Sequence, residues 1–380
     1  MFALKPHTLV LTVAGSHAHG THQPSSDLDL RGVCVAPRSL RLSLSRTFEQ
    51  HTGVLPDDLV ETVQATLQSR GTPVPPESME CVIFDIAKFL KLCAAANPNT
   101  LEILFADPSD WLIASPGWRT LYDRRQVFLT KRVQKSFSGY GLAQLRRIQT
   151  HRGWLLKPPQ TQPARRDFGL PDATVLSRDQ QGRIERGIAD KIESYGVGDL
   201  GLDPTTRATV EARMSQFYLD ALQTSTDALD PSMRAVATRA LNLSPELTNT
   251  LTAEKRYRAA KREWRAYQSW KAHRNRARAD LERAHGFDTK HAMHLVRLLR
   301  MGLEVLRGEG VQVRRPDTED LCAIRSGAWT FDKVLSHAED LHGQMTAAAE
   351  VSALPEEVDP DLVDAMLLEV LDAFDGSPGA

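Results

Sequence analysis

The beginning of the chain separates into an apolar block, a polar block and an alternating block, which predicts two strands joined by a turn. Residues 7–14 are mostly apolar and end abruptly at Gly15-Ser16. In the alternating block, two leucines are interspersed with Asp27 and Asp29. Because residues i and i+2 of a strand project from the same face, both carboxylates point one way while the leucines enter the core.

The two carboxylates and the turn form a pattern typical of chemistry on phosphate groups. Neighbouring carboxylates repel each other unless a cation lies between them, and Mg²⁺ prefers such oxygen ligands. Gly15 allows the backbone a positive φ and a close approach, and the N–H groups of such a turn, beside the Ser16 hydroxyl, can bind phosphate. A phosphate-binding turn next to Asp27 and Asp29 suits phosphoryl or nucleotidyl transfer.

A third strand is predicted at residues 81–86, which are apolar and β-branched, and a helix follows it. Asp85 lies near the end of this strand. A carboxylate at this point is well suited to complete a metal site with Asp27 and Asp29. The alternative is that Asp85 caps the following helix.

Aromatic residues punctuate a strongly basic helix predicted at residues 255–283. They are Tyr257, Trp264, Tyr267 and Trp270. Arginine and lysine neutralise phosphates and aromatic rings stack on bases, so this pattern favours RNA as a partner. An ordinary solvated helix with its aromatic residues turned into the core is the alternative.

The next predicted helix has an apolar core face and, elsewhere on its surface, Lys290, His294 and Arg297. These three residues share one face because they are three or four positions apart. We interpret the face as one that meets a nucleotide triphosphate or its acceptor. A zinc site at His291 and His294 is an alternative, but it has no Cys or Glu partner at suitable spacing. A polar face that only docks on the N-terminal domain is another.

Four stretches resemble a known family: GSHAHGTHQPSSDLDLRGV, with its G-S-x(10)-D-x-D spacing, FLTKRVQKSFSGYGLAQL, GFDTKHAMHLVRLLRMG and RRPDTEDLCAIRSGAW. They resemble the DNA polymerase β-like nucleotidyltransferase superfamily, and within it the RlaP-like branch associated with RNA repair. The resemblance implies a mixed catalytic sheet in which Asp27, Asp29 and Asp85 hold two Mg²⁺ ions, or Mn²⁺ in their stead. It also implies a nucleoside triphosphate whose phosphates contact the glycine–serine turn. Lys131, on the helix that follows the sheet in the resembled branch, is a further candidate ligand of these phosphates.

Composition and charge add the organisation of the chain. Four scattered cysteines, an N-terminus unlike a signal peptide and the lack of any apolar run of bilayer length predict a cytoplasmic protein without a membrane span. The net charge of −1 conceals a strongly basic segment at 251–300 and an acidic end. We predict an α+β fold. It has a catalytic domain at 1–125 with a surface excursion at 37–76, a mostly helical domain with a basic face at 126–345, and an acidic C-terminal helix or tail at 346–380.

Together these patterns predict a metal-dependent nucleotidyltransferase. It would transfer a nucleoside monophosphate from a nucleoside triphosphate to a hydroxyl acceptor and release pyrophosphate. The basic aromatic segment and the resemblance both point to an RNA end as the acceptor. The alternatives are a nucleotidyltransferase that modifies a protein or a small molecule, and a catalytically silent nucleotide-binding module. The sequence leaves the nucleotide preference and the oligomeric state open.

Overall fold

The computed structural model describes most of the chain in six stretches and four single positions. These are residues 2–24, 26–72, 74–75, 79–172, 245–273 and 276–376, and positions 186, 190, 193 and 208. The chain divides into two compact units, one formed by residues 1–156 with 276–380 and the other by residues 157–275. Within the predicted 126–345 region, residues 173–244 lie outside the described residues, apart from those four positions. The description resumes at residue 245, where the next helix begins.

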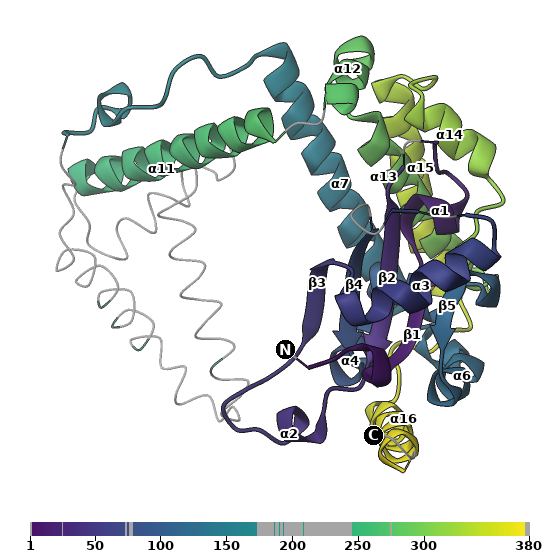
Figure 1. The fold of residues 1–380 in the computed structure, drawn as a ribbon. Helices are drawn as coiled ribbons and strands as arrows, with labels where there is room; N and C mark the ends of the chain where they lie inside the picture. Colours follow the sequence, from purple (N-terminus) through teal and green to yellow (C-terminus); the bar gives the residue numbers. More distant parts are fainter. Residues whose placement is uncertain are drawn as a thin grey trace. The chain divides into compact units, whose positions relative to one another are not determined.

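A mixed five-stranded sheet forms the N-terminal part of the larger unit (Figure 1). Its strands lie in the order β3-β4-β2-β1-β5, with β2 and β4 parallel and the other neighbours antiparallel. Every residue of the interior strand β1 is buried, which explains its continuous apolar character. The predicted α+β class with a mixed N-terminal sheet is confirmed. The strands are β1 (Thr8–Val13), β2 (Leu28–Cys34), β3 (Gln50–Val54), β4 (Met79–Asp85) and β5 (Trp111–Ala114).

The segment 37–76 joins this sheet at its edge. It supplies β3, which pairs antiparallel with β4, and helix α3 (Asp57–Ser69). Leu59, Val63 and Leu67 recur every four residues, so they form one apolar face. That face packs in a core cluster with the leucines of β2 and therefore covers one side of the sheet.

Helices from distant parts of the chain cover the other side of the sheet. Apolar residues of α4 (Ile86–Ala94), α5 (Pro98–Leu104) and α13 (Thr289–Leu306) form one buried cluster with Val10 and Val33. The apolar face predicted for α13 is buried. Because α13 belongs to the C-terminal half of the sequence, the catalytic sheet and the helical region share a single core.

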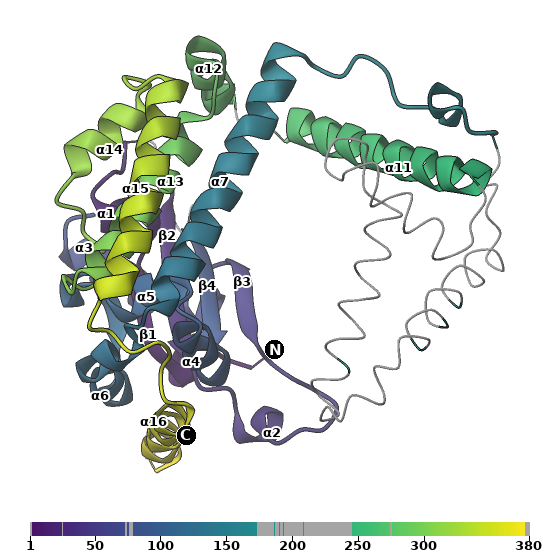
Figure 2. The same ribbon diagram turned by 180° about the vertical axis from the view of Figure 1, so that it is seen from behind.

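The C-terminal region is all helical in the described residues, as predicted (Figure 2). Helix α13 packs against α7 (Arg132–Leu156), α14 (Thr318–Arg325) and α15 (Phe331–Val351). A Cβ atom at Gly302 of α13 would lie 2.5 Å from Met345 Cε of α15, so glycine permits this close helix contact.

The acidic end of the chain forms helix α16 (Pro360–Asp375), which packs against α4 and α6 (Pro116–Asp123). Arg41 pairs with Asp375 at 2.5 Å. Arg124 pairs with Glu369 at 2.6 Å. The remaining short elements of this unit are η1 (Lys5–His7), α1 (Gly15–His19), α2 (Arg38–Arg41), η3 (Pro108–Asp110), η4 (Arg125–Phe128) and α12 (Arg276–His285).

The described part of the smaller unit contains η5 (Arg165–Phe168) and the long basic helix α11 (Pro245–Ala272). The guanidinium of Arg165 binds the buried carboxylate of Glu254, with Nη1 and Oε2 3.2 Å apart. Tyr267 is buried and its ring contacts those of Trp264 and Trp270. The helix also exposes a series of arginines: Arg256, Arg258, Arg262 and Arg265.

In the part of the chain that the structure describes, no helix combines the length and the apolar character that crossing a membrane requires.

Candidate functional site

The turn that follows β1 is built against Asp29 of β2. Gly15 has a φ of +61°, a left-handed backbone conformation that glycine adopts without steric cost. A Cβ atom at position 15 would overlap the Asp29 carboxylate. The N–H of Ala14 donates to the Asp29 carbonyl at 2.8 Å. The turn and the carboxylate are therefore directly adjacent, and Ser16 follows in the first turn of α1.

Gly15 and Asp29 line a cavity of about 290 Å³ that is bounded by the sheet, α1, α5, α7 and α13. These elements come from both ends of the sequence, and Figure 1 shows α1, α7 and α13 on the same part of the larger unit. The polar lining includes His19 of α1, Asp29 and Arg31 of β2, Glu102 of α5, Gln144 of α7 and Arg297 of α13.

Glu102 links α1 to α13 at this cavity. One carboxylate oxygen accepts a hydrogen bond from Arg297 Nη1, and the other lies 3.2 Å from His19 Nε2. Burial by itself would raise the pKa of Glu102, but Arg297 and His19 outweigh it and hold that pKa well below its usual range. Burial and the charge of Arg297 lower the pKa of His19. At neutral pH the cluster is therefore an ionised Glu102–Arg297 pair beside a neutral imidazole.

Helix α13 brings two of its three candidate phosphate ligands to the cavity. His294 and Arg297 line it, whereas Lys290 is exposed near the start of the helix and lies outside the lining. Burial, then the charge of Arg297, lowers the pKa of His294 well below its usual value. His294 is therefore a neutral hydrogen-bonding group, and Arg297 supplies the positive charge of this helix at the cavity.

Asp27 and Arg31 flank Asp29 along the chain. Asp27 immediately precedes β2, and its side chain is exposed at the strand end that carries Asp29. Arg31 Nη2 lies 3.8 Å from Asp29 Oδ1, and the two side chains are 30% and 37% exposed. Solvent screens a pair this exposed, so Arg31 neutralises Asp29 only in part.

The structure separates Asp85 from Asp29, which corrects the expected triad of carboxylates. In the parallel pairing of β2 with β4, Asp85 lies opposite Cys34, five strand positions from Asp29, a separation of roughly 16 Å at the usual rise per residue. Asp85 caps α4 instead, where it accepts from Ala87 N–H at 3.0 Å and from Ala36 N–H at 3.3 Å. Burial raises its pKa, although these hydrogen bonds oppose the shift.

Glu80 is the acid of β4 that neighbours Asp29. The strand register pairs these two residues directly, and paired residues of adjacent strands project from the same face. Glu80 is exposed between the buried residues Met79 and Cys81. That alternation was readable in the sequence, but the strand predicted at 81–86 begins too late to include it, because the observed strand begins at Met79.

Segment 314–329, which carries one of the resembling motifs, holds the residues around α1 in place. The N–H of Arg315 donates to the His19 carbonyl at 3.2 Å. Arg325 Nη1 donates to the Thr21 carbonyl at 2.7 Å. The backbone on the far side of the glycine–serine turn is therefore fixed by residues about 300 positions later in the chain.

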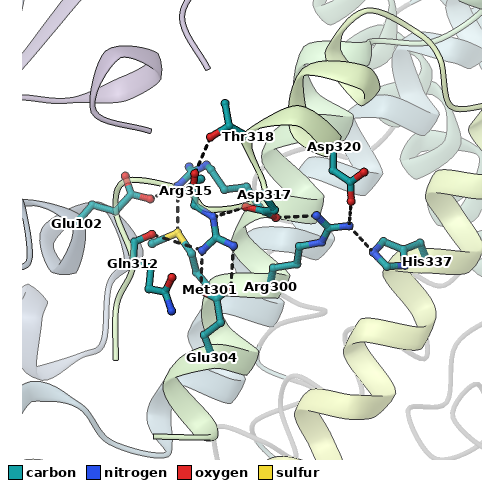
Figure 3. Close-up of polar contacts among 11 residues, drawn as sticks. Glu102, Arg300, Met301, Glu304, Gln312, Arg315, Asp317, Thr318, Asp320 and His337 are labelled. Carbon is teal, nitrogen blue, oxygen red and sulfur yellow. Dashed lines mark hydrogen bonds and ion pairs between the residues drawn. The ribbon is translucent and has the colours of Figure 1, made fainter. Parts of the chain in front are cut away.

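Arg315 is itself fixed by a buried network (Figure 3). Its side chain is 1% exposed, and its two terminal nitrogens bind both oxygens of Glu304 at 2.6 and 2.7 Å. Its Nε donates to Asp317 at 2.8 Å, and Asp317 also accepts from Arg300 at 2.6 Å. Each charge in this network therefore has a partner of opposite sign.

Lys131 does not line the cavity, so it is not placed to bind phosphates together with His294 and Arg297 as expected. Its ammonium group pairs with Glu356 at 2.8 Å, and its N–H donates to the Pro355 carbonyl at 2.8 Å. The observed contacts of Lys131 therefore tie the start of α7 to the segment before α16.

The zinc alternative finds no support in the position of His291. Its Nδ1 lies 2.7 Å from Asp288 Oδ2 and its Nε2 lies 3.0 Å from Arg147 Nη1, so both ring nitrogens have protein partners. Within the described residues, the possible ligand atoms that lie within 4.8 Å of one another belong to His151, Glu282 and Asp288. This group surrounds the N-terminus of α13 and does not include His294.

The residues at the ends of β2 and β4 fit a hard divalent cation. Asp27, Asp29 and Glu80 offer carboxylate oxygens, the ligands that Mg²⁺ and Mn²⁺ prefer. Arg31 balances their charge only in part, since it lies 3.8 Å from Asp29 and its side chain is 30% exposed. Donor chemistry and local charge therefore suit a divalent cation, although these three carboxylates are not among the described groups whose ligand atoms lie within 4.8 Å of one another.

Comparisons with known proteins agree with this geometry. Residues 5–158 match the RlaP family model, described as an RNA repair pathway DNA polymerase beta family. The chain is also 24% identical over 137 residues to an uncharacterized 38.9 kDa protein of the nrdC-mobD intergenic region of Enterobacteria phage T4. That alignment spans about a third of each protein, 35% of this chain and 36% of the phage protein. No solved structure matches the chain. Residues 5–158 therefore resemble the RlaP family of DNA polymerase β-like proteins, and this match implies a nucleotidyltransferase.

Proposed function

We propose that this protein is a metal-dependent nucleotidyltransferase that transfers a nucleoside monophosphate from a nucleoside triphosphate to a hydroxyl of an RNA end. The observation that carries this proposal is the cavity at which Gly15, Asp29 and Arg297 meet. It combines a turn suited to phosphate, a carboxylate suited to a cation and a buried guanidinium. The match of residues 5–158 to the RlaP family model supports nucleotidyl transfer as the class of reaction.

The protein groups that line the cavity, together with Ser16 and Lys290 outside its lining, have distinct roles in this proposal. The N–H groups of the glycine turn and the Ser16 hydroxyl bind the β- and γ-phosphates. Arg297 stabilises the negative charge that develops on the leaving phosphates, and neutral His294 donates a hydrogen bond to them. Lys290 lies one helical turn before His294 and binds an outer phosphate or the acceptor.

In the reaction, the acceptor oxygen forms a bond to the α-phosphorus, the bond from that phosphorus to the β-phosphate oxygen breaks, and pyrophosphate leaves. Asp27, Asp29 and Glu80 would hold divalent cations at the strand ends. When bound, Mg²⁺ supplies Lewis-acid stabilisation of the phosphate charge. Glu80, on the strand beside Asp29, is the residue we assign to accept the proton of the attacking hydroxyl.

Variants at Glu80 and at Asp85 form a matched pair, because opposite effects on activity are expected from them. Glu80→Gln is expected to lower nucleotidyl transfer by about a hundred-fold, in line with the loss of a catalytic base or a cation ligand. Asp85→Asn is expected to leave the rate within about threefold, because Asp85 caps α4 far from Asp29, and to reduce stability by about 1 kcal/mol. Initial rates and urea unfolding of both variants measure these effects. The reverse order of activity losses would restore the triad with Asp85.

RNA is the acceptor that the observations favour. The matched family is described as part of an RNA repair pathway. Helix α11 of the smaller unit exposes a series of arginines and carries three partly exposed aromatic residues, Tyr257, Trp264 and Trp270, a combination that neutralises phosphates and stacks on bases. A protein or small-molecule acceptor and a silent nucleotide-binding module are the competing functions.

The test is the transfer of label from each α-³²P nucleoside triphosphate in turn, with Mg²⁺ and pooled cellular RNA. The products are separated into RNA, protein and small-molecule fractions, and the control lacks divalent cations. Label in RNA that depends on Mg²⁺ is expected. Label in another fraction would support a different acceptor, and nucleotide binding without transfer to any fraction would favour the silent module.

A further inference from the structure

Three buried polar atoms of cavity-lining residues have no hydrogen-bond partner among the described residues. They are His19 Nδ1, Gln144 Oε1 and Arg297 Nε. The side chains of His19 and Arg297 are 2% and 7% exposed, so both lie in the protein interior rather than at its surface. An unsatisfied buried polar atom costs about 1–3 kcal/mol. These atoms are themselves enclosed by protein, so a ligand with the matching group removes that cost when a small rotation of the side chain turns the atom toward the cavity.

The contact with Glu102 determines which nitrogen of His19 carries the proton. Glu102 is ionised, because Arg297 and His19 hold its pKa low, and an ionised carboxylate only accepts hydrogen bonds. His19 Nε2, 3.2 Å away, is therefore the donor. Burial keeps the ring neutral by lowering its pKa. The remaining nitrogen, Nδ1, then carries a lone pair and can only accept.

A buried acceptor of this kind discriminates among the parts of a nucleotide. Phosphate oxygens are themselves acceptors, so they gain nothing from Nδ1. The donors of a nucleotide, apart from the ring N–H of guanine and uracil, are the ribose hydroxyls and the exocyclic amino group of the base. His19 is also only four residues from Gly15, at the end of the same short helix.

We propose that His19 Nδ1 accepts a hydrogen bond from a hydroxyl or amino group in the nucleoside part of the substrate, with Glu102 as the residue that positions the ring. The inference rests on the proposed nucleotide site and assigns to it a specificity-determining residue. Three groups of the nucleoside can donate this hydrogen bond: the 2′-hydroxyl, the 3′-hydroxyl and the amino group of the base. Substrate analogues that lack one of these groups distinguish them.

The experiment measures equilibrium binding by calorimetry, so it needs no knowledge of the acceptor. The full chain, with Mg²⁺, is titrated with the tightest-binding of ATP, GTP, CTP and UTP as its non-transferable α,β-methylene form. Three analogues follow, lacking the 2′-hydroxyl, the 3′-hydroxyl or, where the base has one, the exocyclic amino group. The wild type is expected to bind one of them about tenfold more weakly than the parent.

Two variants separate recognition by Nδ1 from a structural role of the ring. In His19→Gln, the amide reaches the position of Nε2 and keeps the hydrogen bond to Glu102, but no polar atom replaces Nδ1. In His19→Asn, the amide occupies the position of Nδ1 and does not reach Glu102. The glutamine variant is expected to bind the parent and the discriminated analogue equally, whereas the asparagine variant keeps part of the preference. Thermal unfolding verifies that both variants fold.

The outcomes are distinct. A wild type that binds parent and all analogues with equal affinity overturns the inference and leaves the proposed function intact, and this arm requires no variant. A glutamine variant that keeps the full preference of the wild type also overturns it. A wild type that binds none of the four nucleotides overturns the proposed function itself.

Discussion

Replacing Asp29 by asparagine is expected to lower the rate of nucleotidyl transfer at least about a hundred-fold. A cation ligand contributes several kcal/mol of transition-state stabilisation, and each 1.36 kcal/mol corresponds to about a factor of ten in rate. Asparagine has the same shape and keeps the backbone contact in which the Asp29 carbonyl accepts from Ala14. The substitution therefore removes the charge and retains the turn.

The fold is expected to tolerate this substitution. Among the residues that the structure describes, Asp29 forms its one ion pair with Arg31, at 3.8 Å and partly exposed, so the loss of this pair costs at most about 1 kcal/mol. The measurement is the initial rate of label transfer, with urea unfolding in parallel. Asp364→Asn, an exposed acid on α16, is the matched control and should keep full activity. A folded Asp29→Asn protein with near-normal transfer would remove the carboxylate from the mechanism.

Arg315→Ala is expected to reduce the free energy of unfolding by about 3 kcal/mol, because it removes a buried guanidinium and leaves two partly buried carboxylates without their partner. The Arg315 side chain is 1% exposed and binds Glu304 at two oxygens and Asp317 at one. Part of that carboxylate charge remains paired, since Arg300 also binds Asp317. The uncompensated charge falls mainly on Glu304.

The neighbouring Arg314 provides a control of the same residue type. Its side chain is 56% exposed and pairs with Asp110 at 3.0 Å. Asp110 is buried, but solvent reaches the guanidinium that pairs with it, so Arg314→Ala is expected to cost about 1–2 kcal/mol, less than Arg315→Ala. Urea unfolding followed by circular dichroism compares the two variants. Equal losses of unfolding free energy would show that the Arg315 network contributes no more to stability than the Arg314–Asp110 pair. Because the backbone of residue 315 contacts His19, the Arg315→Ala protein that remains folded is also expected to bind nucleotide more weakly than the wild type.

Local patterns in the sequence were sufficient for the elements that carry the turn and the first carboxylates. The apolar run before Gly15 forms β1, and the alternation around Asp29 forms β2. Both are short-range signals, because strand periodicity and the backbone freedom of glycine depend on neighbouring residues alone. The same holds for α13, whose apolar periodicity predicted its buried face.

The identity of the acid beside Asp29 depended on strand register. The sequence predicted a strand at residues 81–86 that carries Asp85, whereas the observed strand also includes Glu80. Which of the two acids lies beside Asp29 depends on how this strand pairs with β2. The observed register puts Glu80 opposite Asp29 and Asp85 opposite Cys34. Register is determined by the packing of both sheet faces, which a single strand does not encode.

The sequence by itself thus determined the class of fold, the glycine–serine turn and Asp29 as the centre of a candidate phosphate site. Tertiary structure alone decided which distant residues complete that site. Glu102, Gln144 and Arg297 come from three helices whose apolar faces pack together, and their polar side chains meet only as a result of that packing. Hydrophobic burial is non-directional, so a chain reveals which faces are buried but not which polar groups their packing will bring into contact.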